Sequence, residues 1–317
     1  MLFSGNIMID MLLNTSVLLL SIIFLWKGAD SLVDSASRIA VKFGVSDLVV
    51  GLTIVAFGTS APEFAVTINA ALKDQAAISV GNIVGSNIFN TGFILGFVAL
   101  FTSIKATKKI IYRDGAFMLG SSLLLLFFFR DYTLDRFEAL IFIILISLYL
   151  AFLFIKKEPL EEIEHHEGAR RVDYLILPIS IAVVIAGGHY LVESASYIAR
   201  FIGLSDWIIG VTIVAFGTSA PEMATSLAAL LKGKHGMSAG NLIGSNIFNI
   251  LGVLGVAGAL SPLIVSSEAV ISMGILCVMS FIMLFLFRTG MILSRLEGLV
   301  LVILSIISYL IIFANNL

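Results

Sequence analysis

Two glutamates, Glu63 and Glu222, lie deep inside strongly apolar stretches, and each ends the same hexapeptide, GTSAPE. No lysine or arginine stands at comparable depth in any apolar segment of the chain. A carboxylate in hydrocarbon is costly unless something neutralises it. The structural alternative is an acid paired with a basic group on a neighbouring helix. Because no basic residue is available in sequence, the pair predicts an intramembrane site for a cation or a proton.

Oxygen-bearing residues accompany both glutamates. Proline has no N–H, so Pro62 and Pro221 leave carbonyls of the preceding turn partly unpaired. Further candidate ligands are hydroxyls within one turn of each acid and Ser/Asn pairs that stand four apart and so share a helix face; these are Thr59, Ser60, Thr218, Ser219, Ser86, Asn90, Ser245 and Asn249. The set contains only oxygen donors, without His or Cys, which favours hard ions such as Ca²⁺ and Na⁺. Magnesium fits less well because it dehydrates reluctantly.

The candidate ligands belong to a duplicated sequence. Residues 51–63 match 210–222, and residues 81–90 match 240–249, always at an offset of 159, with 25 identities over forty aligned positions. The match extends upstream, where LVDSAS at 32–37 aligns with LVESAS at the same offset. Two copies in strict register indicate one site built from both halves. Four further repeated asparagines are expected to bond helix to helix, with the lining of an ion pathway as the alternative: Asn82, Asn87, Asn241 and Asn246.

The composition is that of an integral membrane protein. Of 317 residues, 59% are hydrophobic and 13% are charged, whereas soluble domains carry roughly 25% charge. The mean hydropathy is +1.08. A net charge of −2 gives no indication of a nucleic-acid partner, and the single cysteine, Cys277, excludes an intramolecular disulfide. The first apolar run lacks the basic start of a secretory signal, so we interpret it as a retained helix.

Ten segments are long and apolar enough to span a bilayer: 11–26, 47–72, 76–102, 115–129, 138–155, 174–199, 206–231, 236–261, 267–287 and 297–314. We therefore expect an all-α membrane protein with a first five-helix repeat at 1–156, a short cytoplasmic linker at 157–173 and a second repeat at 174–317. An odd number of spans in each half inverts the second half relative to the first. Gly, Ser, Asn and Pro predict interruptions in helices 2, 3, 7 and 8.

The distribution of basic residues sets the expected orientation. With the N-terminus outside, fifteen of the nineteen Lys and Arg fall in cytoplasmic loops, as the positive-inside rule requires. The C-terminus is then also extracellular and the linker cytoplasmic. The linker is rich in glutamate and contains His165 and His166. We interpret it as a solvated connection, with a weak cation sensor as the alternative.

The paired GTSAPE and GNxxGSNIFN blocks resemble the two alpha-repeats of the sodium/calcium exchanger family, within the cation/calcium antiporter superfamily. The resemblance covers both repeats and the ten-helix layout, and the short linker is similar to that of prokaryotic members. It implies a membrane antiporter, not an enzyme, that exchanges Na⁺ for Ca²⁺ by alternating access, while the first and sixth helices slide across the other eight. It implies no cofactor beyond the transported ions and no obligate protein partner.

The resemblance also assigns roles to matching positions. Glu63 and Glu222 would bind both ions, and Thr59 and Thr218 would contribute backbone oxygens to the calcium site. Flanking sodium sites would be lined by hydroxyls and by two backbone carbonyls, from Ser60, Ser219, Ser86, Ser245, Ala56 and Ala215. Asn90 and Asn249 would border the middle position. Some relatives, including the potassium-dependent branch, have Asp where Asn249 stands, so its amide argues against potassium dependence.

Three other functions remain open at this point. A Ca²⁺/H⁺ antiporter would use the same glutamates with protons in place of sodium. A cation channel would conduct calcium with no counter-ion, although the duplicated site and broken helices favour a transporter. An intramembrane hydrolase could use two carboxylates as acid and base, but no nucleophile with an adjacent His accompanies them.

Overall fold

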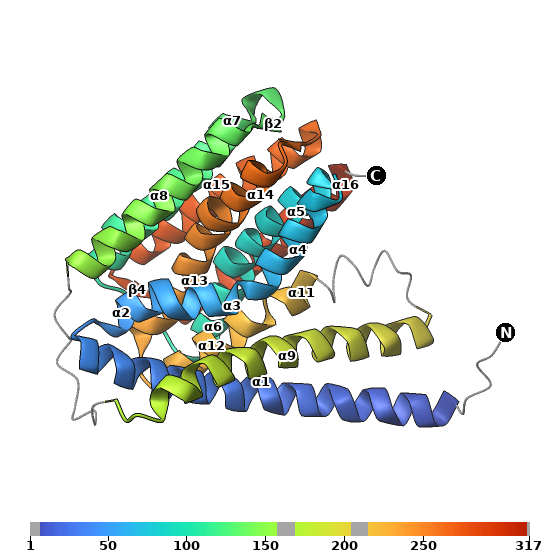
Figure 1. The fold of residues 1–317 in the computed structure, drawn as a ribbon, viewed down its shortest axis with the longest axis vertical. Helices are drawn as coiled ribbons and strands as arrows, with labels where there is room; N and C mark the ends of the chain where they lie inside the picture. The colour runs from blue at the N-terminus through green and yellow to red at the C-terminus, as the bar shows by residue number, and fades with distance from the viewer. Residues whose placement is uncertain (1–6, 157–168, 204–214, 316–317) are drawn as a thin grey trace.

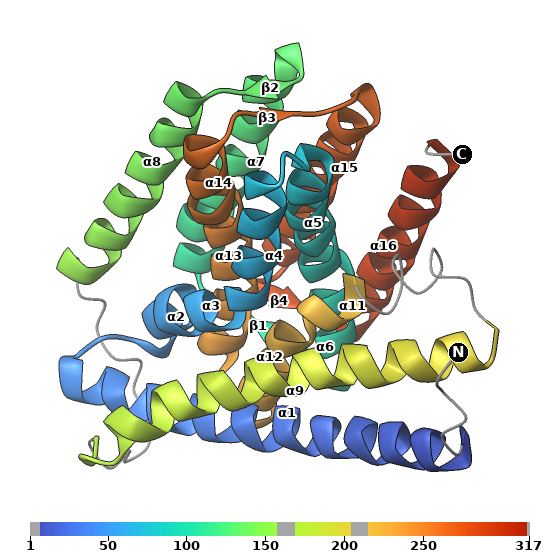
Figure 2. The same ribbon diagram turned by 45° about the vertical axis from the view of Figure 1, so that its right-hand side comes forward.

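The structure is a computed structural model that describes residues 7–156, 169–203 and 215–315. Two long helices, α1 (Ile7–Phe43) and α9 (Asp173–Phe201), lie side by side and run in opposite directions along one side of a bundle formed by the other helices (Figures 1 and 2). The sequences are apolar almost throughout, and a helix satisfies its backbone N–H and C=O groups within the segment. The fold is therefore helical nearly everywhere in the described residues.

The bundle comprises helices from both halves of the chain. In the first half these are α2 (Asp47–Val50), the π-helical η1 (Gly51–Val55), α3 (Ala56–Thr59), α4 (Ala61–Leu72), α5 (Ala76–Ile88), η2 (Phe89–Ile94), α6 (Leu95–Phe101), η3 (Ile110–Gly115), α7 (Ala116–Phe128), η4 (Phe129–Asp131) and α8 (Arg136–Ile155). In the second half they are α11 (Ala215–Thr218), α12 (Ala220–Leu231), α13 (His235–Ile247), η6 (Phe248–Leu254), α14 (Gly255–Leu260), α15 (Ser267–Arg288) and α16 (Arg295–Asn315).

Eight helices in the described ranges are long and apolar enough to cross a membrane, or nine when the bent pair α2–α3 and α4 is taken as one span. Most predicted segments agree closely with these helices. The predicted segment 206–231 and the predicted linker 157–173 both lie partly outside the described residues. The first helix is longer than its apolar core of 11–26, because it continues through weakly polar sequence to Phe43. The chain is thus a multi-pass membrane protein.

The interruptions predicted in helices 2 and 7 are present in the described residues, whereas those predicted in helices 3 and 8 are not. Helix 2 breaks at Ser60, where α3 and α4 meet at an angle of 50°, and α12 likewise begins one residue after Ser219. In contrast, the spans Ala76–Phe101 and His235–Leu260 are unbroken. Each contains a π-helical stretch, η2 or η6, in place of a gap. The weak helix formers in these spans therefore widen a turn and do not end the helix.

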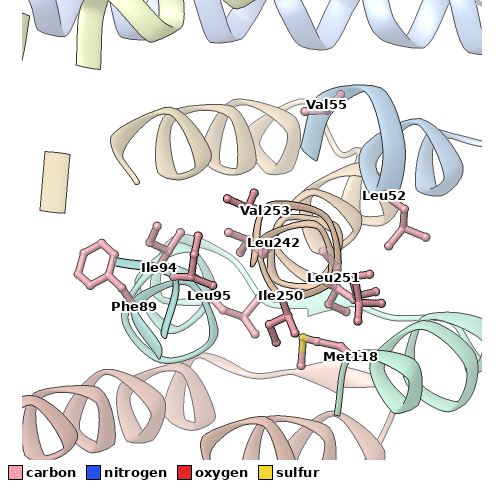
Figure 3. Packing of buried hydrophobic residues seen from close by; sticks show 14 of the residues in the cluster. Leu52, Val55, Phe89, Ile94, Leu95, Met118, Leu242, Ile250, Leu251 and Val253 are labelled. Atoms are coloured by element: carbon pink, nitrogen blue, oxygen red, sulfur yellow. The ribbon is translucent and has the colours of Figure 1, made fainter. Parts of the chain in front are cut away.

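Close packing in the core joins the two halves. The η1–α3 segment packs against α13, and a methyl group built on Gly244 would lie 2.8 Å from the Leu52 carbonyl oxygen and 2.9 Å from the Ala56 Cβ. Figure 3 shows Leu52 and Val55 on one side of this crossing and Leu242 on the other. All three side chains are buried. A residue larger than glycine at position 244 would separate these helices.

Two short antiparallel ladders also connect the halves. The strand β1 (Ile104–Lys105) pairs with β4 (Ile292–Leu293), and β2 (Thr133–Leu134) pairs with β3 (Leu263–Ile264). The offset of 159 residues maps β1 onto β3 and β2 onto β4, so the two ladders are equivalent. These two-residue strands were not predicted from the sequence, because segments this short show no alternating pattern.

Candidate ion-binding site

Glu63 and Glu222 lie immediately after the two helix breaks and are fully buried. Each carboxylate accepts a hydrogen bond from a serine of the other half. Ser219 Oγ donates to Glu63 Oε1 over 3.1 Å, and Ser60 Oγ donates to Glu222 Oε1 over 3.1 Å. Because these serines occupy equivalent positions in the repeat, the arrangement is reciprocal. The structure thus brings together two acids that are 159 residues apart in sequence.

The second oxygen of each carboxylate is available for a ligand. Glu63 Oε2 and Glu222 Oε2 are buried and have no hydrogen-bond partner in the described part of the chain. No ion pair reaches either glutamate from those residues, which contradicts the interpretation that a basic side chain neutralises them. Buried polar groups are nearly always partnered. Two such oxygens, one from each half, form the core of a cation site.

Hydroxyl and carbonyl oxygens of the first half border the same site. Thr59 Oγ1 lies 3.2 Å from Asn241 Oδ1 and 3.4 Å from Ser245 Oγ, and it also contacts the Ala56 carbonyl oxygen at 3.3 Å. Ser245 Oγ lies 3.4 Å from Glu222 Oε1. The α3 segment and α13 therefore place predicted site residues of both halves around one carboxylate.

The remaining predicted residues occupy equivalent positions. Ser86 is buried on α5, at the position that corresponds to Ser245 in the repeat. Ala215 and Thr218 begin and end α11, the short helix before the break at Ser219. Their positions alone do not show that these two residues bind an ion, so their role stays a prediction.

Two asparagines at the centre differ from each other despite their equivalence in sequence. Asn249 Nδ2 donates to Asn87 Oδ1 over 3.0 Å, and Asn249 Oδ1 has no hydrogen-bond partner among the described residues. Within the same residues, neither polar atom of Asn90 is hydrogen-bonded. Both side chains are fully buried. Their amide oxygens are therefore available as neutral ligands.

Repeated asparagines fix the backbone next to the glutamates. Asn82 Nδ2 donates to the Glu63 carbonyl oxygen over 3.3 Å, and Asn241 Nδ2 donates to the Glu222 carbonyl oxygen over 3.3 Å. The predicted helix-to-helix role of these residues is confirmed. Their second acceptor, a hydroxyl four residues after each glutamate, was not predicted from the sequence. Thr67 Oγ1 accepts a hydrogen bond from Asn82, and the equivalent hydroxyl of the second half accepts one from Asn241. The signal that could have revealed this contact is the hydroxyl residue at both repeat positions.

Cavities approach the site on two sides. One, of about 300 Å³, is lined by Ser86 and extends to Glu268 and Tyr309. A smaller one, of about 110 Å³, is lined by Ser60 together with Phe57 and Phe248. One of the predicted site serines thus borders each cavity.

A family model described as sodium/calcium exchanger protein matches residues 13–156 and 172–314. The chain belongs to the sodium/calcium exchanger family. It is 34% identical to the sodium/calcium exchanger MaX1 of Methanosarcina acetivorans over 95% of this chain and 98% of that protein. It is 33% identical to the inner membrane protein YrbG of Escherichia coli, over 80% of this chain and 81% of that one.

Solved structures agree with this family assignment. The sodium-calcium exchanger NCX_Mj, soaked with 2.5 mM Na⁺ and 0.1 mM Ca²⁺, superposes with a TM-score of 0.83 at 32% identity, covering 93% of this chain and 97% of that one. This exchanger-family chain is therefore a transporter and not an enzyme, and Na⁺ and Ca²⁺ are the ions that the family transports.

Proposed function

We propose that this chain exchanges Na⁺ for Ca²⁺ across the membrane at the site formed by Glu63 and Glu222. The main support is the reciprocal arrangement in which each glutamate accepts a hydrogen bond from the other half and keeps one buried oxygen unpartnered among the described residues. Two carboxylates match the charge of one Ca²⁺, and the neutral oxygens around them can complete six to eight ligands. The sodium/calcium exchangers among the relatives support the same cargo.

Each site residue has a proposed role. The two glutamates bind Ca²⁺ and Na⁺ alternately, and Thr59 and Thr218 add oxygens to the calcium position. Sodium positions on either side are lined by the four serines and two backbone carbonyls named from the sequence: Ser60, Ser219, Ser86, Ser245, Ala56 and Ala215. Asn90 and Asn249 border the middle position. The Asn249 amide uses its nitrogen to bond Asn87, which leaves its Oδ1 available as a neutral ligand.

The charge of the empty site makes exchange obligatory. Without cations, two buried carboxylates would face the low-dielectric centre of the bilayer, which is unfavourable. Loading with either several Na⁺ or one Ca²⁺ offsets that charge and permits the change between inward-open and outward-open states. A midplane site shared by two halves is typical of transporters built from inverted repeats.

The proposed topology has ten spanning helices in two inverted five-helix repeats, with both termini outside and the linker in the cytoplasm. The strict 159-residue offset and the equivalent ladders β1–β4 and β2–β3 support the twofold plan. The excess of Lys and Arg in the proposed cytoplasmic loops supports the orientation.

The test is ⁴⁵Ca²⁺ uptake into proteoliposomes loaded with Na⁺, with K⁺-loaded and choline-loaded vesicles at matched pH as controls. We expect uptake only with internal Na⁺ and none from Glu63→Gln. The matched control is Glu138→Gln, the same chemical change in the first turn of α8, where glutamine can also fill the capping position. This control should retain uptake. Normal uptake by Glu63→Gln would refute the site assignment.

The same vesicles distinguish the alternatives. Uptake driven only by a proton gradient would identify a Ca²⁺/H⁺ antiporter with the same glutamates. Uptake that needs no counter-ion would identify a channel. The Ca²⁺/H⁺ alternative shares every contact described above, whereas the enclosed carboxylates of Glu63 and Glu222 argue against a continuous conducting path.

A further inference from the structure

A lysine just after α12 holds α1 at one end of the bundle. Lys232 Nζ lies 2.6 Å from Asp34 Oδ1 and 2.7 Å from Asp30 Oδ1, and it donates to the Asp30 carbonyl oxygen over 2.9 Å. The two aspartates stand four apart and so share one face of α1. The Lys232 side chain is 24% exposed. We call this set of contacts the Lys232 clasp.

The next lysine strengthens the same attachment. Lys234 Nζ donates to Ser37 Oγ and lies 3.4 Å from Asp47 Oδ2, and Ser37 Oγ donates to Asp47 Oδ1 over 2.6 Å. Ser37 is one turn beyond Asp34 on α1. The two lysines in the loop after α12 thus contact α1 over a length of two helical turns.

The same charged pair occurs at the 159-residue offset with the two halves exchanged. Lys73 corresponds to Lys232, and Glu193 on α9 corresponds to Asp34. The two turns have the same backbone form, because Asp74 has φ 56° where Gly233 has φ 74°. The same backbone hydrogen bond closes both turns. The N–H of the second residue after each lysine donates to the carbonyl oxygen of the residue five positions before it. Lys73 therefore occupies the same position in its turn as Lys232 does in the equivalent turn of the second half.

This second pair is open in the structure. Lys73 is exposed and makes no ion pair within the described ranges, while Glu193 is 66% exposed and lies 3.9 Å from His189 Nε2. Asp34 and Glu193 lie near opposite ends of the α1–α9 pair, since the two helices run in opposite directions (Figures 1 and 2). The Lys232–Asp34 pair is therefore in contact, whereas the described residues show no Lys73–Glu193 ion pair.

The helices α1 and α9 are joined to each other. Arg38 Nη2 lies 2.7 Å from Asp173 Oδ1, and the Asp173 side chain is fully buried. A methyl group built on Gly187 would lie 3.1 Å from the Leu25 backbone nitrogen, so the two backbones approach closely. A displacement of α1 therefore carries α9 with it.

We propose that the Lys232–Asp34 and Lys73–Glu193 pairs are alternate clasps, each closed in one of two transport states. This inference rests on the proposed exchange, which requires two states that expose the site to opposite sides. Because a lysine and an acid occupy the equivalent positions of the two pairs, exchanging the roles of the halves closes the Lys73 pair and opens the Lys232 pair. Closure of one clasp holds its end of the bundle shut while the other end opens.

The test is cross-linking on a background with Cys277→Ala, which removes the only cysteine of the chain. Two double variants are compared in proteoliposomes, Asp34→Cys with Lys232→Cys and Lys73→Cys with Glu193→Cys. The reagent is a short, reducible bis-methanethiosulfonate, and cross-linked peptides are identified by mass spectrometry. The matched control joins Asp34→Cys with Lys73→Cys, which takes one member from each clasp.

We expect both clasp pairs, but not the control, to cross-link during Na⁺/Ca²⁺ exchange. Each cross-link should reduce ⁴⁵Ca²⁺ uptake to the level of empty liposomes, and reduction should restore it. Failure of the Lys73–Glu193 pair to cross-link, or unchanged uptake by cross-linked protein, would overturn the proposal. Uptake by the uncross-linked protein is measured separately, so loss of the proposed exchange itself is distinguished from loss of the clasps.

A charge exchange provides a second measurement that does not depend on cysteine. Lys232→Asp should slow uptake because it places like charges together, and adding Asp34→Lys should restore much of the rate by re-forming the pair in reverse. A double variant that is as slow as Lys232→Asp, although both proteins elute as folded species of the same size, would contradict a clasp.

Discussion

Gly244 leaves no room for a side chain where α13 crosses the η1–α3 segment. A Cβ at this position would lie 2.8 Å from the Leu52 Cα and carbonyl oxygen, whereas ordinary contacts begin near 3.4 Å. The Gly244→Ala variant must therefore widen the crossing by about 0.6 Å. Two of the nearest atoms belong to backbone and cannot rotate away, so we expect the helices themselves to shift. Overpacking of this kind costs roughly 1–3 kcal/mol.

The shift also reaches the ion site, because Ser245 follows Gly244 and Thr59 lies across the crossing. Calcium–oxygen distances span only about 0.3 Å, so a displacement of about 0.6 Å removes at least one ligand from its position. We take the lost ligand to contribute as much free energy as a hydrogen bond to a charged group, about 1.5–3 kcal/mol. Its loss then lowers the Ca²⁺ affinity by roughly 10- to 150-fold.

The assay combines thermal unfolding in detergent with Ca²⁺-dependent uptake in proteoliposomes. For a chain of 317 residues the packing cost lowers the melting temperature by about 1.5–4.5 °C. Gly274→Ala is the matched control, because a methyl group there meets no atom within 4 Å among the described residues. It should be neutral or slightly stabilising, since Ala is the better helix former. Equal melting temperature and equal Ca²⁺ affinity in the two variants would refute the reasoning.

Three further predictions follow from the site and its supports. Ser60→Ala and Ser219→Ala should weaken Ca²⁺-dependent uptake to a similar extent, by roughly 10-fold or more, because each removes one hydrogen bond to a buried glutamate; initial rates against Ca²⁺ concentration measure this, and a strong effect of one variant alone would contradict reciprocity. Asn249→Asp should make uptake pH-dependent, since only a protonated carboxyl can replace the amide as hydrogen-bond donor; a flat pH profile would count against the bond. Asp173→Asn should lower the melting temperature by several degrees, because it leaves Arg38 without its buried partner, and an unchanged unfolding curve would show that this pair does not hold α1 to α9.

The spans were predictable because the bilayer imposes their length. The segment predicted at 76–102 is Ala76–Phe101 in the structure, and that predicted at 267–287 is Ser267–Arg288. The apolar part of the first helix was predicted to end before Lys27, with a weakly polar extension up to Arg38 that includes Asp30 and Asp34, and α1 continues to Phe43. The cost of these two aspartates is offset by Lys232, about 200 residues away, and no local pattern reveals such a partner.

The site was predictable in its members but not in its pairing. The repeat and the intramembrane acids identified Glu63, Glu222 and their oxygen-rich neighbours. Sequence spacing could not show that Ser60 would donate to the glutamate of the opposite half, because that contact joins residues 162 positions apart. Nor could it distinguish the break at Ser60 from the π-helical widening at Phe89, since both arise from weak helix formers in an apolar run.

The two β-ladders have a consequence for how such a chain assembles. Each half contributes one strand to each ladder, and exchanging the halves reproduces the same pairs. An interface that maps onto itself in this way has the form of an isologous dimer contact. The full chain thus corresponds to a dimer of two half-length subunits joined by a tether. A fragment that ended before β3 would leave β1 and β2 without partners, and two copies of such a fragment carry complementary edges for each other.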